Sequence, residues 1–349
     1  MITAMKKIHF IPLCLAVFLF TSCERAFMNS DVPNNPVSVF DYLWNKVDQQ
    51  YAFFDLKGVD WDSVYEVYRP KVYDDMDADS LFSVCAAILN TLRDGHTNLM
   101  SDFDVSRNDS VYYKMYAEKN IETSVVLLNY LTVAHHTTGS FAHNAIRNSK
   151  VAYIRYNSFS SDISEKSLKY LLHRYQNCEG IILDLRQNGG GSFNNISQLL
   201  SILDNHGQPL YQTQIKSGPK HNEFTPQNTV YANSDMNLDD SLCPYTKPVA
   251  VLIDRGSYSA TSYFSLCTKA YDNVMLFGDY SGGGLGIPNG GALPNGWTYR
   301  FSITRTFDMN GNNYENGVPP DVRVILDPAC TAQGIDNVIE AAADWIEQF

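Results

Sequence analysis

The feature that most limits what this chain can fold into is a change of hydrophobic period part-way along it. From Val125 onward, short apolar segments alternate with segments whose apolar residues recur at helical spacing. The segment 249–253 is apolar throughout and 180–185 is apolar except for Asp184, which is typical of strands covered by helices on both faces. Strands that alternate with helices build a layered α/β structure. We therefore expect an α/β domain over residues 150–349.

The same pattern predicts the elements of this domain. The expected strands are 151–156, 180–185, 249–253, 274–277, 299–306 and 322–325, and the expected helices are 163–175, 193–203, 259–270 and 335–345. The segment 209–244 is polar and has no clear period, so we expect it to run over the surface.

Residues 38–100 show helical periodicity instead. Ser38 and Asp41 have the spacing of a capping box at the start of a first helix. A second helix is expected after Asp60 and a third over 79–92. Their aromatic residues could line a ligand groove, but core packing is the commoner use of apolar residues at this period. We expect a small helical N-terminal domain, followed by a short connecting region at 101–149.

Composition excludes several classes of protein. Of 349 residues, 44% are hydrophobic, which is enough for a large core and excludes a disordered chain. Acidic residues outnumber basic ones by 38 to 26, so nucleic acid is not an expected partner. The seven cysteines form no C-x-x-C pair, and we expect no disulfide framework, metal site or cofactor. His135 and His136 are adjacent on an expected strand, point to opposite faces, and are assigned to the surface.

The N-terminal segment has the features of an export signal. Lys6 and Lys7 precede an apolar run, 8–20, that is too short for a permanent membrane span but suits a signal peptide. Small residues then lead to Cys23, which resembles the bacterial lipobox, whose cysteine is lipidated. The alternative is an ordinary secretory signal with an incidental cysteine.

We predict a lipoprotein signal at 1–22 and a polar, proline-containing tether at 23–37. The expected location is the cell envelope, facing the periplasm or the cell surface, with the lipid on Cys23 as the membrane anchor. With Cys14 removed and Cys23 lipidated, five thiols remain, so at least one stays unpaired. The sequence does not indicate an oligomeric state.

Three places could carry chemistry, and the first is the segment 92–97. There a glycine follows the third expected helix and leaves His96 in a loop. Histidine suits a general base because its ordinary pKa lies near neutral pH. A single loop histidine is more often structural, so this signal is weak by itself.

The second place is a glycine turn. The buried strand ends at Asp184 and opens into Gly189, Gly190 and Gly191 before a helix. Bare backbone N–H groups at a helix start can bind an anion. The occupant could be a phosphate, although no phosphate-binding motif matches, or the oxyanion of an acyl transfer. A plain tight turn is the alternative.

The third place is the segment 251–262, again a strand, a turn and a helix start, which presents several hydroxyl groups. A serine at a helix start is most often a cap. Raised on a sharp turn, however, it becomes an exposed nucleophile whose oxyanion meets the next backbone N–H, as in a nucleophile elbow.

Five motifs stand in one order along the chain. They are Leu-x-Asp-Gly-His-Thr at 92–97, Asp-Leu-Arg-x-Asn-Gly-Gly-Gly at 184–191, Ser-x-Ser-Ala-x-Ser at 257–262, Gly-Asp at 278–279 and Glu-Asn-Gly-Val-Pro-Pro-Asp-Val at 315–322. This order resembles the C-terminal processing, or tail-specific, serine peptidase family. The resemblance extends back to 51–62 and so covers nearly all of 38–349.

The resemblance implies a crotonase-like ββα layered core and assigns roles to residues. Ser259 corresponds to the nucleophile of the family. Ala260 would supply one N–H of the oxyanion hole, and the Gly189/Gly190 pair would supply the other. The resemblance thus implies a serine endopeptidase that forms an acyl-enzyme with a peptide or an unfolded protein.

Two branches of the family differ in the base. One branch uses a lysine, but here Gly284 stands at that position, which excludes that dyad. The other branch, similar to the tricorn-type peptidases, uses a histidine oriented by a glutamate, and these correspond to His96 and Glu315. In that branch a serine precedes the histidine and joins the relay. This chain has Gly95 there, so that member is missing or is replaced by Asp94 or Thr97.

Two further implications concern binding. A PDZ-like insert often follows the histidine motif, but 101–149 is short for one, so recognition of a free C-terminus is not implied. Related proteins that carry ligands on this fold suggest an alternative, an inactive lipoprotein that binds a peptide or a hydrophobic ligand. Coenzyme A chemistry is disfavoured because the chain has an export signal.

Overall fold

The computed structural model describes residues 32–349 apart from 204–206, 234–237 and 239–240. The predicted signal peptide, most of the predicted tether and Cys23 lie outside the described residues. In the part of the chain that is described, no helix combines the length and the apolar character needed to cross a membrane. The cysteines described, Cys85, Cys178, Cys243, Cys267 and Cys330, are all free thiols.

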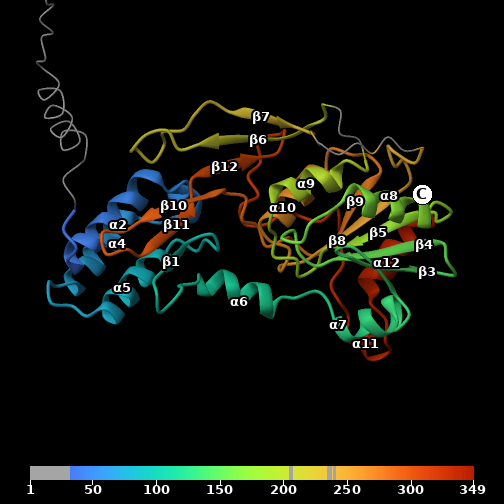
Figure 1. The fold of residues 1–349 in the computed structure, drawn as a ribbon, viewed down its shortest axis with the longest axis horizontal. Coiled ribbons are helices and arrows are strands. Elements are labelled where there is room, and N and C mark those ends of the chain that lie inside the picture. The colour runs from blue at the N-terminus through green and yellow to red at the C-terminus, as the bar shows by residue number, and fades with distance from the viewer. Residues whose placement is uncertain (1–31, 204–206, 234–237, 239–240) are drawn as a thin grey trace, which may run out of the picture.

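A seven-stranded sheet forms the centre of the larger part of the molecule (Figure 1). Its strand order is β13-β9-β8-β5-β4-β3-β2. The first five strands in this order are parallel, and β3 and β2 continue the sheet in antiparallel pairing. The strands are β2 (His136–Thr138), β3 (Phe141–Ile146), β4 (Val151–Tyr156), β5 (Gly180–Asp184), β8 (Val249–Ile253), β9 (Val274–Gly278) and β13 (Val322–Arg323).

Both faces of this sheet are buried, as its apolar sequences predict. In β5, Ile181 and Leu183 pack on one face and Ile182 on the other, because successive side chains of a strand alternate. The first face contacts α8 (Glu165–Arg174), α9 (Phe193–Leu200) and α10 (Ala260–Thr268). The second contacts α7 (Thr123–Val125), η2 (Val126–Leu131) and α12 (Asn337–Ile346). The predicted α/β class is thereby confirmed.

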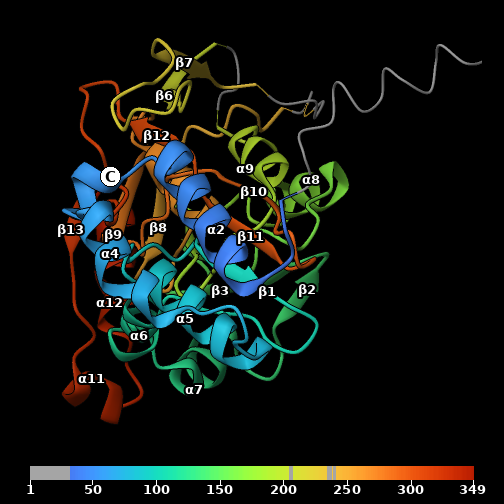
Figure 2. The ribbon, with the colours of Figure 1, turned by 90° about the vertical axis from the view of Figure 1, so that its left-hand side faces the viewer.

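The N-terminal helices lie at the other end of the molecule, against a three-stranded sheet (Figures 1 and 2). The helices are α2 (Pro36–Gln50), α3 (Phe54–Lys57), α4 (Trp61–Tyr68), η1 (Arg69–Lys71) and α5 (Ala78–Asn90). The sheet has the order β1-β11-β10, with β1 (Asn98–Met100), β10 (Pro288–Ala292) and β11 (Thr298–Ser302). Trp297, Tyr299 and Phe301 complete the apolar core beneath the helices.

The structure shows what the two ranges 38–100 and 101–149 contribute to the cores and sheets. The core of the helical region 38–100 is built mostly from its own residues and is completed by a segment from the C-terminal half of the chain. The range 101–149 also does more than connect. It contains α6 (Asp109–Ala117) and the strands β2 and β3, so the central sheet begins before residue 150.

Some local predictions were also wrong. The first helix is capped by Asn35, whose side-chain oxygen accepts the N–H of Ser38 at 2.9 Å, and it begins at Pro36, a residue suited to that position. The polar stretch 209–244 contains a hairpin of β6 (Pro209–Ile215) and β7 (Asn228–Tyr231). This hairpin pairs with β12 (Thr304–Phe307). Most residues of these two strands are half-buried. Their sequence therefore lacks the alternation of apolar and polar residues that would have predicted them. The short α11 (Pro328–Ala332) precedes the last helix.

Candidate active site

The turn after α5 fixes the backbone at His96. Arg93 has a φ of +49°, which reverses the chain at the end of the helix. The Oδ1 of Asp94 accepts the N–H of His96 at 2.8 Å. The His96 side chain is only 6% exposed, so the ring is nearly enclosed and a proton on it is not freely solvated.

Ser259 occupies the turn between β8 and α10. Its φ of 56° and ψ of −120° are rare for a residue with a side chain. Its hydroxyl does not cap the helix, which excludes the ordinary role of a serine at this position. Two neighbouring loops hold the turn: the N–H of Tyr258 donates to Asn188 O at 3.0 Å, and that of Ser259 donates to Gly283 O at 2.9 Å. Strain of this kind persists only where the surroundings impose it, and it often marks a functional site.

The structure brings Ser259 and His96 together, although 163 positions separate them in the sequence. The Nε2 of His96 lies 2.9 Å from the Oγ of Ser259. This is the distance at which a histidine can accept a proton from a hydroxyl group.

The glycine turn after β5 lies directly against the serine. A Cβ at Gly190 would approach that of Ser259 to 2.9 Å and the Tyr258 carbonyl to 2.6 Å, so only glycine fits. The N–H of Gly190 donates to Asn188 Oδ1 at 3.1 Å and is therefore occupied. Among the described residues, no hydrogen bond uses the N–H of Gly189 or of Ala260. Since Ala260 begins α10, its N–H also lies at the positive end of the helix dipole.

A cavity of about 600 Å³ opens in front of these groups. It is lined by His96, Ser259, the three glycines and the guanidinium-bearing residues Arg107 and Arg300. A volume of this size is typical of a small-molecule or peptide subsite.

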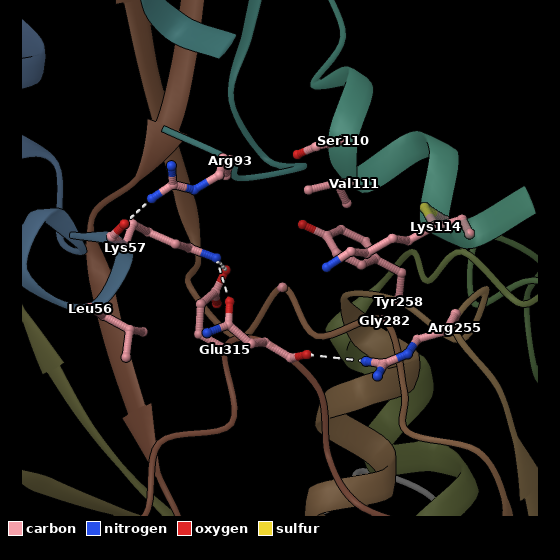
Figure 3. A pocket seen from close by; sticks show the side chains of 13 residues that line it. Leu56, Lys57, Arg93, Ser110, Val111, Lys114, Arg255, Tyr258, Gly282 and Glu315 are labelled. Atoms are coloured by element: carbon pink, nitrogen blue, oxygen red, sulfur yellow. Dashed lines mark hydrogen bonds and ion pairs between the residues drawn. The ribbon is translucent and has the colours of Figure 1, made fainter. Parts of the chain in front are cut away.

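Glu315 is 3% exposed, and it lies near the pair without contacting the histidine by a hydrogen bond. Its Oε2 accepts the N–H of Gly286 at 2.9 Å, and its Oε1 lies 3.8 Å from Lys57 Nζ (Figure 3). Burial raises the pKa of Glu315 to about 8, and the nearby charge of Asp94 acts in the same direction. Lys57 opposes this effect. Sequence reasoning missed Lys57, which comes from α3 and has no motif.

The Nδ1 atom of the His96 ring, the nitrogen that does not contact Ser259, is in an unusual environment. It is buried and has no hydrogen-bond partner in the described part of the chain. Burial lowers the pKa of His96, while the charge of Asp94 and the Gly286 carbonyl raise it. That carbonyl faces the ring without meeting the geometry of a hydrogen bond to Nδ1. Glu315 is thus connected to the histidine only indirectly. It accepts the N–H of Gly286, and the carbonyl of the same residue faces the His96 ring.

Comparison with known proteins places this geometry in a family. The model for peptidase family S41 matches residues 150–324, and the model for the Tricorn protease C1 domain matches residues 34–90. The first match covers half of the chain. The chain belongs to peptidase family S41.

Individual S41 relatives agree with this assignment. The crystal structure of a candidate peptidase from Parabacteroides merdae is 35% identical, with a TM-score of 0.82, and the match covers 90% of this chain and 97% of that one. The nisin-resistance protein of Lactococcus lactis is 26% identical over 181 residues, 52% of this chain and 53% of the relative. The carboxy-terminal processing protease CtpB of Bacillus subtilis is 23% identical over 181 residues, 51% of this chain and 35% of the relative. The chain thus spans about half or less of these two curated relatives.

Within this S41 chain, the position of the dyad lysine has no room for a side chain. Gly284 has a φ of +75°, and a Cβ there would lie 2.4 Å from the Tyr258 ring. Thr97, considered as a replacement for the relay serine, has a buried hydroxyl without a partner among the described residues. His135 and His136 are both exposed. No cluster of potential metal ligands occurs in the described ranges.

A second pocket, of about 520 Å³, lies behind Tyr258 and contains Glu315 (Figure 3). Four cationic side chains line it, and three are held by groups of the chain itself. Lys57 Nζ donates to Asn316 Oδ1 at 2.7 Å, Arg93 donates to the Lys57 carbonyl, and Arg255 donates to the carbonyls of Ser281 and Asn316 at 3.3 Å. The fourth is Lys114 of α6.

Proposed function

We propose that this protein is a serine endopeptidase that cleaves peptide bonds through an acyl-enzyme on Ser259. The observation that carries the proposal is the contact of 2.9 Å between Ser259 Oγ and His96 Nε2, on a strained turn that exposes the hydroxyl to the cavity. Membership of family S41 supports the same reaction class.

The chemistry follows from the positions of the groups. Ser259 Oγ attacks the substrate carbonyl carbon while its proton passes to His96 Nε2. The carbonyl oxygen becomes an oxyanion, which the N–H groups of Ala260 and Gly189 are free to stabilise. The imidazolium then gives its proton to the leaving amine as the C–N bond breaks. Water, deprotonated by His96, releases the acyl group from Ser259.

We assign Glu315 an indirect role in this reaction. It holds the N–H of Gly286, and the carbonyl of the same residue faces the His96 ring. A side chain without an acceptor at this position would loosen the loop and reduce the orientation of the base, whereas glutamine keeps an oxygen that can accept the N–H of Gly286. We therefore expect Glu315→Gln to be milder than His96→Ala, which removes the proton acceptor itself.

We further propose that the protein acts in the cell envelope, anchored by a lipid on Cys23. The basis is the N-terminal signal followed by small residues and a cysteine. The substrates would be peptides or unfolded proteins of that compartment. The alternative function, ligand binding without catalysis, is disfavoured because a carrier has no need of a serine and a histidine in hydrogen-bond contact.

A fluorophosphonate probe tests the proposed activity without knowledge of the substrate. Purified protein should gain the mass of one phosphonyl group, and peptide mapping should place it on Ser259. The Ser259→Ala variant should gain none. A wild-type protein that stays unlabelled at pH 8 would favour the binding-protein alternative.

A further inference from the structure

Tyr258, next to the nucleophile, projects its hydroxyl into a space that two glycines leave open. A Cβ at Gly95 would lie 2.6 Å from the Tyr258 oxygen, and one at Gly284 would lie 2.7 Å from it. The phenol therefore fills the volume of a side chain both before the histidine and at the loop near Glu315. The Tyr258 and His96 rings are in contact, with centroids 5.1 Å apart.

The hydroxyl belongs to a cluster of unpaired polar atoms. Eight buried side-chain atoms lack a hydrogen-bond partner among the described residues, and four of them surround this site. They are Asp94 Oδ2, His96 Nδ1, Thr97 Oγ1 and the Tyr258 hydroxyl. Unpaired buried polar atoms are costly and uncommon, so their concentration beside the base indicates a functional arrangement.

The charges around Tyr258 make it a hydrogen-bond donor. Burial raises its pKa well above the ordinary value, and the charges of Asp94 and Glu315 raise it further. The phenol therefore keeps its proton at neutral pH and faces two carboxyl groups that can accept a hydrogen bond. The N–H of Gly95 also approaches the phenol oxygen and opposes these effects by lowering the pKa of Tyr258.

We propose that Tyr258 is a positioning residue whose hydroxyl connects His96 Nδ1 to the buried carboxyl groups of Asp94 and Glu315. The proposal rests on the proposed function of Ser259 and His96. When His96 takes the serine proton, its Nδ1–H donates to the phenol oxygen, and the phenol O–H donates to a carboxyl oxygen of Asp94 or Glu315. The phenol proton stays on Tyr258. Hydrogen bonds of a catalytic relay are often incomplete in the free enzyme and shorten as charge develops.

Other charged and titratable groups near this site also affect the pKa values of its residues. Arg300 of β11 lowers the pKa of both His96 and Tyr258. Burial raises the pKa of Tyr51, which follows α2, and the charges of Asp94 and Glu315 and a hydrogen bond to Asp94 raise it further, so Tyr51 is a second donor near these carboxyl groups. The charge of Arg300 and burial both disfavour the imidazolium form of His96, and a hydrogen-bonded link through Tyr258 would stabilise that form.

The test is the rate of fluorophosphonate labelling as a function of pH in Tyr258→Phe, which keeps the ring and removes the hydroxyl. Tyr245→Phe is the matched control, since both tyrosines are 7% exposed and both hydroxyls lack a partner among the described residues. We expect Tyr258→Phe to label Ser259 about tenfold to a hundredfold more slowly, the effect of a hydrogen bond to a charged group. Its acidic limb should move to lower pH, because the imidazolium loses a stabilising partner.

A merely structural role would slow labelling without moving the acidic limb, and that outcome would overturn the proposal. So would an equal loss in Tyr245→Phe. As a second measurement, Asp94→Asn keeps the acceptor for the His96 N–H, and its effect should not add to that of Tyr258→Phe. Full additivity would also refute the link. Absence of labelling in the wild-type protein would instead reject the proposed function.

Discussion

The buried carboxyl group of Glu315 allows a quantitative prediction about stability. Its folded pKa is raised from 4.5 to about 8, with burial as the main cause. Between these values the folded state holds a proton that the unfolded state has released, so stability falls as pH rises. At about 1.4 kcal/mol per pH unit, the loss has an upper bound of about 5 kcal/mol. This bound already includes the effect of Lys57, which lies 3.8 Å away and lowers the pKa of Glu315.

The perturbation is Glu315→Gln, which keeps the shape and the acceptor for Gly286 but cannot ionise. At pH 5 both proteins are neutral at this position, and their unfolding free energies should be similar. At pH 8.5 the variant should be more stable by up to about 5 kcal/mol, because only the wild type has a carboxylate to bury. For a chain of this size that is a rise in Tm of several degrees.

The assay is thermal unfolding by circular dichroism from pH 5 to pH 8.5. Asp308→Asn serves as the control, because hydrogen bonds led by that from Asn312 lower the pKa of Asp308 despite partial burial. Its carboxylate stays ionised over the whole range, so the control should change Tm by a constant amount. A Glu315→Gln effect that is likewise constant with pH would show that Glu315 is ionised in the folded protein, and the reasoning would fail.

Three further predictions concern the site and the anchor. Ser259→Ala should abolish peptide hydrolysis while leaving the circular dichroism spectrum unchanged. Ser262→Ala should retain turnover, because the Ser262 hydroxyl only bonds to Ser257 O and Ser281 Oγ; the reverse result would mean that the nucleophile has been misassigned. Burial lowers the pKa of His96, and a base acts only when neutral, so the acidic limb of kcat/KM should lie below pH 6.5, and a limb near 9 would point to another base. Cys23→Ala should move the protein from the membrane to the soluble fraction, and retention in membranes would contradict a lipid anchor.

Much of this molecule was predictable because its signals are local. The strands 151–156 and 249–253 agree with β4 and β8, since runs of buried apolar residues have few other uses. A helix, α4, begins after Asp60 as expected, and Asp60 caps it, because a helix start depends mainly on adjacent residues. The order of the five motifs was sufficient to predict the family, which the comparisons confirm.

Other features depended on contacts between distant segments. The N-terminal helices complete their core with Trp297 and Phe301, and no local pattern marks that pairing. The link from Glu315 to His96 through Gly286 depends on backbone groups, which every residue has, so side-chain identity could not predict it. Tyr258 is also invisible to motif reasoning. Its hydroxyl matters because two glycines leave space for it, and only the tertiary structure decides which side chain fills a space.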